Sequence, residues 1–145
     1  MGVNIMKKLE KVNVILKREN VLEYDEKIKC KDDLIDFIIK NEDLDLKAEM
    51  ECYVIVLNIK NQILGYSLIA KGGLDSAVID LKNIFKTTLL LNGAKIIILK
   101  NNPSGNDGFS SFDRELKEQL LKACDIMQIK FLDFITTTKK YTSLF

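Results

Sequence analysis

The sequence predicts an α/β fold in which helices pack in layers against a mixed β-sheet. Short continuous runs of apolar and β-branched residues, typical of buried strands, alternate along the chain with amphipathic segments at helical spacing. Two early strand-like runs are separated only by a short polar turn, which favours an antiparallel hairpin and therefore a sheet that is not purely parallel. The length of 145 residues fits one domain.

The first 30 residues are expected to be a strand and loop extension of a single domain that spans residues 1–145. Alternation over residues 12–16 predicts a strand, and the largely polar stretch 18–29 predicts a loop or irregular hairpin. Glu10 and Glu19 lie among the basic residues here, so a solvated face is favoured over a DNA-binding arm. The basic residues are Lys7, Lys8, Lys11, Lys17 and Arg18.

A helix and a hairpin are expected next. Residues 31–41 are predicted to form a helix, because an amphipathic pattern follows two acidic residues that suit a helix N-terminus. A charged stretch, 41–49, leads to residues 52–58, whose continuous β-branched and aromatic character is typical of a strand buried on both faces. Turn residues at 58–62 then favour antiparallel pairing with a second strand over 63–70.

The second half of the chain, after a break at Gly72 and Gly73, alternates helices with strands. Asn92-Gly93 suits the end of its first helix. The segment 100–113 contains the only proline and runs from a strand into a helix, a place where functional sites collect. The predicted elements are a helix over 81–91, a strand over 94–99, a helix over roughly 113–128, a strand over 129–135 and a short strand over 140–145.

Composition excludes several kinds of chemistry. The chain has no histidine, which removes Ser-His-Asp and Cys-His catalysis and every histidine-ligated metal site. With 22 basic and 21 acidic side chains, its charge gives no argument for binding nucleic acid or an acidic membrane. The isolated cysteines Cys30, Cys52 and Cys124 are expected to be reduced and mostly buried. No apolar run suits a membrane span or signal peptide, so the expected location is the cytoplasm.

The loop that follows the strand at 94–99 has two interpretations from its residues alone. Backbone N–H groups around Pro103 have the potential to hold an anion, but the glycine spacing matches neither the phosphate loop nor the dinucleotide motif. Ser110-x-x-Asp113 has the spacing of a capping box, and the helix dipole favours an acid at Asp113. Helix capping is favoured over catalysis.

Several segments carry motifs that occur together in one family. Together they resemble the RadC-like JAB domain, a branch of the JAB/MPN metalloprotease superfamily, over most of residues 10–145. The resemblance implies a cytidine-deaminase-like layered sandwich with a mixed, mainly antiparallel sheet flanked by helices. The segments are Leu57-Asn-Ile-Lys-Asn61, Gly73-Leu74, Asn102-Pro-Ser-Gly105, Phe109-Ser-Ser-Phe-Asp113, Leu132-Asp-Phe-Ile135 and Tyr141-Thr-Ser-Leu-Phe145.

The resemblance also implies a zinc site whose ligands have changed. In active relatives two histidines and an aspartate hold zinc, and a water fills the fourth position. The superfamily spacing His-x-His-Pro-x6-Ser-x-x-Asp places Lys100 and Asn102 at the histidine positions and keeps Ser110 and Asp113. A protonated lysine has no lone pair for a metal, and an amide oxygen is a weak ligand. Phe134 replaces the histidine that usually follows Leu-Asp.

The glutamate that acts as base in active relatives is also replaced. Met50 occupies its position, with Glu49 and Glu51 on either side. Adjacent residues of a strand point to opposite faces, so either glutamate needs a bulge or a one-residue register change to reach the site.

The leading hypothesis is a catalytically inactive, metal-free JAB domain that acts as a binding or scaffold module, with no cofactor. Its partner is an unidentified protein or a second copy. Lys100 is expected to pair with Asp113 and supply the positive charge of the missing metal, since a buried carboxylate without a cation is costly.

Two alternatives remain. One is a JAMM-type peptidase or isopeptidase with an altered site, which uses a hard metal on Asp113 and Asn102, or Lys100 as a base in its neutral form. The other is association with DNA, prompted by the DNA-repair label of the family. The near-neutral charge disfavours DNA, because binding to it rests on phosphate neutralisation.

Overall fold

The computed structural model describes residues 6–13, 15–16, 31–72, 79–103, 109–137 and 141–143. Three α-helices, one short 3₁₀-helix and five strands lie in this part of the chain. In chain order they are α1 (Lys31–Glu42), η1 (Leu44–Leu46), β1 (Met50–Leu57), β2 (Ile63–Gly72), α2 (Leu81–Leu90), β3 (Lys95–Asn101), α3 (Ser111–Met127), β4 (Lys130–Thr137) and β5 (Tyr141–Ser143).

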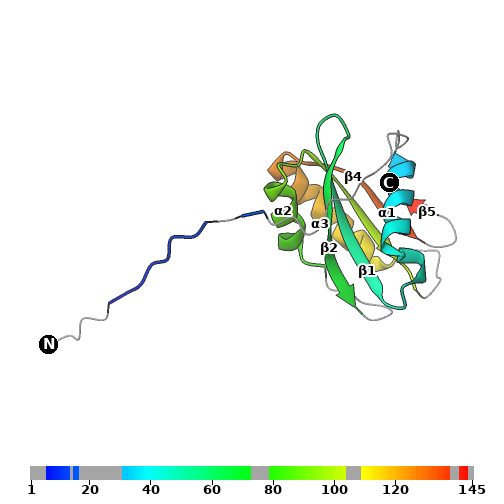
Figure 1. Ribbon diagram of the computed structural model, residues 1–145, viewed down its shortest axis with the longest axis horizontal. Coiled ribbons are helices and arrows are strands. Elements are labelled where there is room, and N and C mark those ends of the chain that lie inside the picture. Colours follow the sequence, from blue (N-terminus) through cyan, green and yellow to red (C-terminus); the bar gives the residue numbers. More distant parts are fainter. Residues whose placement is uncertain are drawn as a thin grey trace.

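The strands form one mixed sheet in the order β2-β1-β3-β4-β5 (Figure 1). β1 pairs antiparallel with β2 and with β3, as β4 does with β5. Only β3 and β4 are parallel, and α3 connects them. The predicted hairpin of β1 and β2 is therefore confirmed, as is the mixed character of the sheet.

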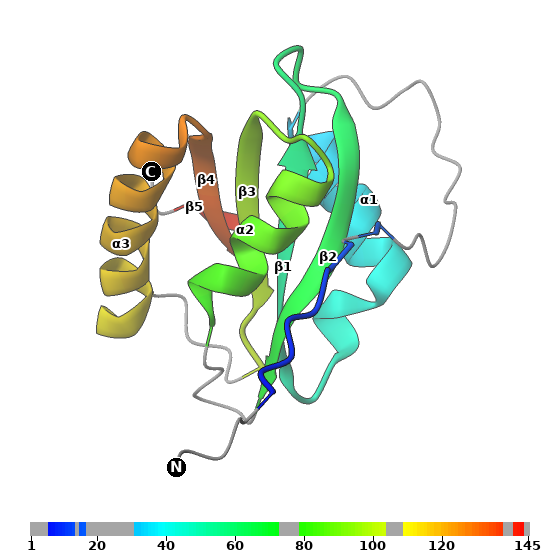
Figure 2. The same ribbon diagram turned by 90° about the vertical axis from the view of Figure 1, so that its left-hand side faces the viewer.

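Helices cover both faces of the sheet, which gives three layers. α2 and α3 lie against one face, here called the α3 face, and α1 lies against the other, here called the α1 face (Figure 2). All eight residues of β1 are buried, as predicted, and alternate residues enter the two cores. Val54, Ile98 and Leu120 belong to the core on the α3 face. Ile38 and Ile55 belong to the core on the α1 face.

The end of α2 sets where β3 begins. Asn92 takes the left-handed conformation with φ 53, and Gly93 N donates to Thr88 O at 2.9 Å. Asn92 N donates to Leu89 O at 3.0 Å, which completes a Schellman motif. Gly93 is needed for space, because a Cβ there would overlap Val56. The predicted stop at Asn92-Gly93 is confirmed.

The strand predicted over residues 12–16 is wrong. Its described residues form no strand, and the side chains of Val12 and Ile15 are 75% and 78% exposed. An alternating pattern needs a neighbouring strand to become part of a sheet, and this segment has none in the described part of its chain. The stretch 18–29 and the Gly73-Leu74 segment lie outside the described residues.

The other predicted elements are confirmed with small changes at their ends. α3 begins at Ser111 and not at residue 113, because Ser110 is its N-cap. β5 covers Tyr141–Ser143 of the predicted final strand, and residues 144–145 lie outside the described residues. Among the helices described, none has the length and apolar character needed to cross a membrane.

Candidate functional site

Lys100 and Asp113 meet on the α3 face of the sheet. Lys100 is near the end of β3, with Cys52 of β1 on one side and Thr136 of β4 on the other. Asp113 lies in the first turn of α3, and the two residues are 9% and 2% exposed. Strand alternation and the start of the helix thus bring a cation and an anion together inside the protein.

The two side chains form a short ion pair. Lys100 Nζ lies 2.6 Å from Asp113 Oδ1, and their side chains are 11% and 3% exposed. Burial removes most of the screening that weakens surface ion pairs, and loss of either partner would leave a charge inside the protein. The expected pairing of Lys100 with Asp113 is confirmed.

The same carboxylate also caps α3. Asp113 Oδ2 accepts a hydrogen bond from Ser110 N at 2.8 Å, and Ser110 Oγ accepts one from Asp113 N at 3.1 Å. This is the predicted capping box. The ion pair and the cap therefore coexist, one on each oxygen, and both oxygens of Asp113 have partners.

Apolar groups surround the ion pair. The ring centroid of Phe134 lies 6.0 Å from Lys100 Nζ, and Phe109 packs edge-on against Phe134 with centroids 5.4 Å apart. Cys52 is fully buried beside Lys100. The hydroxyl of Thr136 is buried and has no hydrogen-bond partner among the described residues. The residue that follows Leu132-Asp133 thus lies at the site, as the family motif implied, but it supplies a ring.

The cysteine at the site is not a nucleophile. Burial raises the pKa of the Cys52 thiol to about 12, the carboxylate of Asp113 acts in the same direction, and the ammonium of Lys100 opposes both. Burial also raises the pKa of Cys124 to about 11. Both thiols stay protonated at neutral pH. The expectation of reduced, buried cysteines is confirmed for Cys52 and Cys124, and Cys30 lies outside the described residues.

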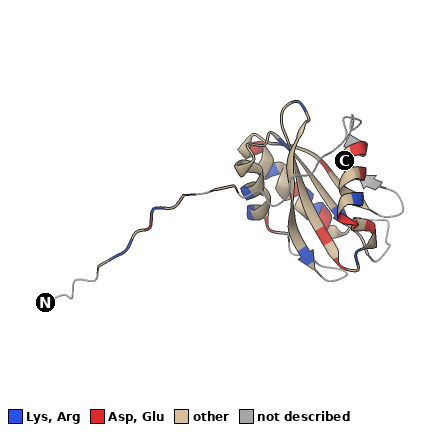
Figure 3. Ribbon diagram, in the orientation of Figure 1, with Lys and Arg blue, Asp and Glu red and all other residues tan. Residues whose placement is uncertain are grey.

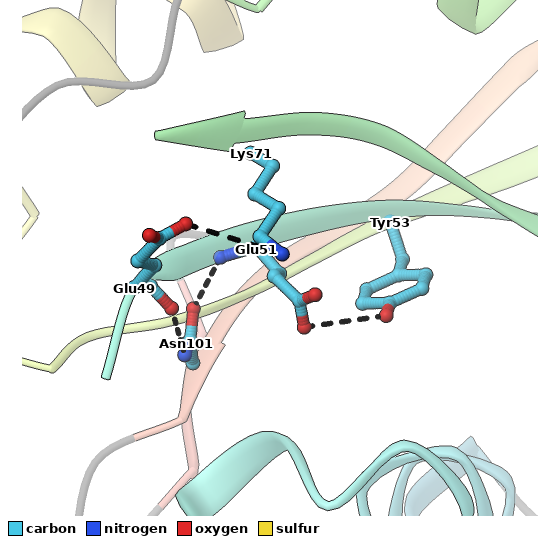
Figure 4. A network of polar contacts seen from close by, with 5 residues as sticks. All are labelled: Glu49, Glu51, Tyr53, Lys71 and Asn101. Atoms are coloured by element: carbon cyan, nitrogen blue, oxygen red, sulfur yellow. Dashed lines mark hydrogen bonds and ion pairs between the residues drawn. The ribbon is translucent and has the colours of Figure 1, made fainter. Parts of the chain in front are cut away.

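The residues around the expected glutamate position do not supply a base to this site. Met50 begins β1 and is buried on the same face as Cys52, two residues away. Glu51 points to the α1 face, beside Tyr53 (Figure 4). Glu49 precedes β1, and its largely exposed side chain lies 4.0 Å from Lys71. The pairing of β1 with β3 is regular from Cys52 to Leu57, and no register change turns Glu51 toward Lys100.

The loop between β3 and α3 is described only at its two ends, residues 102–103 and 109–110. Asn102 N donates to Thr137 O at 3.2 Å, which keeps β3 beside β4 at this end of the sheet. Asn102 and Pro103 are partly buried. Residues 104–108 lie outside the described part of the chain.

Asn101 has a structural role that the sequence did not reveal. It is 2% exposed, and its Oδ1 accepts from Glu51 N at 2.7 Å. Its Nδ2 donates to Glu49 O at 3.0 Å (Figure 4). The same Nδ2 donates to Leu44 O at 3.3 Å. One amide therefore holds the start of β1 and the 3₁₀-helix η1 against β3. An isolated asparagine at a strand end carries no signal of such a role.

A second polar cluster on the α1 face was also missed. Tyr66 OH donates to Glu42 Oε1 at 2.6 Å, and Tyr53 OH donates to Glu42 Oε2 at 3.3 Å and to Glu51 Oε2 at 3.5 Å. The two rings meet edge to face with centroids 5.9 Å apart. Burial and the nearby Glu42 raise the pKa of both tyrosines. Neither glutamate has a lysine or arginine at ion-pair distance in the described part of the chain.

Two of the motifs that carried the family resemblance contact each other. Asp133 Oδ1 accepts a hydrogen bond from Ser143 Oγ at 2.5 Å and one from Phe134 N at 2.8 Å. The Leu-Asp segment of β4 and the closing Tyr-x-Ser segment of β5 are therefore parts of one structural unit. Among the residues that the structure describes, no three His, Cys, Asp or Glu side chains are grouped so that they could hold a metal ion.

Two curated proteins of the UPF0758 group are similar in sequence to this chain. A UPF0758 protein of Gloeothece citriformis is 34% identical over 110 residues, 76% of this chain and 45% of its own. A UPF0758 protein of Listeria welshimeri is 29% identical over 92% of this chain and 57% of its own. The chain spans about half the length of the curated relatives it matches.

The family model described as the RadC-like JAB domain matches residues 28–145, and the mixed sheet with three helices is consistent with a JAB/MPN fold. The chain therefore belongs to the RadC-like JAB domain family.

Proposed function

We propose that this JAB domain is catalytically inactive as a zinc hydrolase and acts as a binding or scaffold module. The observation that carries the proposal is the ion pair of Lys100 and Asp113, 2.6 Å apart and buried on the α3 face. In this account the ammonium of Lys100 supplies the positive charge that zinc supplies in active members of the JAB/MPN superfamily. The JAB fold then serves as a surface for binding and not as a catalyst.

The donor set does not fit zinc. Structural and catalytic zinc sites use thiolate, imidazole and carboxylate ligands. The positions implied for the ligands hold Lys100, Asn102 and Asp113. Oδ1 of Asp113 faces the ammonium of Lys100 and Oδ2 receives the N–H of Ser110, so a metal would have to displace the buried lysine from one oxygen or the helix cap from the other. Cys52, the thiol that lies beside Lys100, keeps its proton at neutral pH.

The second support is that, among the residues that the structure describes, neither glutamate beside Met50 faces the pair. Hydrolysis by zinc requires a group that takes a proton from the bound water. Met50 is at the position implied for the glutamate, and Glu51 is on the opposite face of the sheet. A scaffold role is consistent with a site in which each charged group already has a partner.

The proposal is tested by metal analysis of protein purified without chelator, followed by calorimetric titration with zinc. We expect no stoichiometric zinc and no tight binding in the titration. The double variant Lys100→His and Asn102→His is the matched control, because it restores the ligand types of the family and frees Asp113. One tightly bound zinc per wild-type chain, together with peptide or isopeptide hydrolysis, would overturn the proposal.

A further inference from the structure

The N-terminal segment, residues 6–16, exposes apolar side chains. Met6, Leu9, Val12 and Ile15 are 90%, 98%, 75% and 78% exposed. Figure 1 shows this segment extending away from the sheet and helices. Residues 12–16 keep the alternation of a strand but have no strand beside them in the described part of the chain. In a strand, Met6 and Val12 would point to one face and Leu9 and Ile15 to the other, so pairing at a sheet edge would bury part of this apolar surface.

β2 offers an edge of matching length. It has ten residues, Ile63–Gly72, and only β1 pairs with it in the described part of the chain. Proteins usually protect a long edge with proline, a short strand or several charges. β2 has no proline, and its one charged residue is Lys71, near its end. Leu68 is 44% exposed on this strand.

The charges of the segment and of the surface beside β2 are complementary. Residues 6–16 contain three lysines and one glutamate, whereas residues 32–51 contain eight carboxylates and two lysines (Figure 3). The acidic stretch reaches β2 through Glu42, which accepts from Tyr66 OH at 2.6 Å. Glu42, which is only partly buried, has no basic partner among the described residues, so an added lysine would supply one.

We propose that residues 6–16 of one copy add as a strand to the β2 edge of a second copy, with Lys7 and Lys11, which share one face of a strand, toward the acidic α1 side. Reciprocal exchange would give a closed dimer in which each copy uses the same two surfaces. Main-chain hydrogen bonds at the edge would supply affinity, and the charges would set the direction of the segment. This dimer does not depend on whether the Lys100–Asp113 site is inactive.

The test is sedimentation of the whole chain over a concentration series, with hydrogen exchange of the β2 amides. We expect a dimer whose β2 amides are protected. The triple variant Lys7→Glu, Lys8→Glu and Lys11→Glu should weaken it at least about tenfold. The matched reversal Lys86→Glu, Lys122→Glu and Lys130→Glu, at exposed positions of α2, α3 and β4, should leave it unchanged.

A second pair of variants tests the edge itself. Leu68→Lys places a charge on the β2 edge and should also give monomers, whereas Leu89→Lys at the exposed end of α2 should not. A monomer at every concentration overturns the proposal. A dimer that every variant keeps overturns it as well. Binding of duplex DNA by a monomer, lost in the triple lysine variant, would assign the segment to nucleic acid.

Discussion

The two faces of the sheet carry polar clusters of opposite character, one residue apart along the same strands. On the α3 face, Lys100 lies beside Cys52 and forms an ion pair with Asp113. On the α1 face, Asn101 bonds the backbone of Glu51, and in the described part of the chain the carboxylate of Glu51 has one long contact, from Tyr53. The first cluster is balanced in charge, and the second is acidic. Burial alone therefore does not tell whether an ionised group stabilises this fold.

The largest change in the free energy of unfolding is expected when the carboxylate of Asp113 is removed on the α3 face. Asp113→Ala leaves the ammonium of Lys100 buried without a partner and removes a helix cap, so it should lower the free energy of unfolding by about 3–5 kcal/mol. Urea denaturation measures this free energy of unfolding. Asp125→Ala, exposed on the same helix, should change it by less than about 0.5 kcal/mol.

A double variant shows how much of that loss comes from the charge left behind. Adding Lys100→Met to Asp113→Ala removes the unpaired ammonium and should recover more than half of the loss. If the double variant is as unstable as the sum of both single variants, the ion pair is not the reason for the effect.

On the α1 face, the next largest change in stability is expected when the uncharged side-chain amide of Asn101 is removed. Asn101→Ala removes three hydrogen bonds to the backbone of residues 44, 49 and 51, and should lower the free energy of unfolding by about 2–3 kcal/mol. Asn83→Ala in α2, an exposed position, serves as the control in the same denaturation assay. Equal effects of the two substitutions would show that Asn101 does not hold β1.

The buried thiol beside the ion pair gives a pH test of the α3 face. The pKa of Cys52 is raised from 9.0 to about 12, so the folded state keeps a proton that the unfolded state loses. Stability is fully present below pH 9 and falls as pH rises toward 12, by up to about 1.4 kcal/mol per unit. Denaturation of wild type and Cys52→Ala between pH 8 and 10.5 should show a shallower slope in the variant. Identical slopes would show that the thiol does not titrate differently on folding.

The smallest effect is expected from the carboxylate on the α1 face. Glu51→Gln removes a buried charge that lacks a basic partner in the described part of the chain, so the free energy of unfolding should stay constant or rise by up to about 1 kcal/mol. Glu49→Gln, largely exposed, is the matched change. A loss of more than 1 kcal/mol in Glu51→Gln alone would mean that a cation pairs with Glu51, and the contrast between the faces would fail.

The contrast also explains what sequence could predict. Lys100 and Asp113 occupy two of the ligand positions that the family resemblance implies, so their pairing is predicted from that resemblance. The spacing Ser110-x-x-Asp113 by itself predicts the helix cap. The contacts of Asn101 and Glu51 depend on the register of β1 against β3 and on where η1 lies, which no short segment encodes. Residues 12–16 show the same limit, because alternation predicts which residues share a face and not whether a neighbouring strand exists.

Lys100 is proposed to supply the positive charge that zinc supplies in active relatives, and the effect of zinc on the free energy of unfolding tests this proposal most directly. The free energy of unfolding of the wild type is measured with chelator and then with excess zinc. A ligand at 100 times its dissociation constant would add about 2.7 kcal/mol. We expect no gain in the wild type and a gain in the Lys100→His and Asn102→His variant. A gain of that size in the wild type, abolished by Asp113→Ala, would contradict the account.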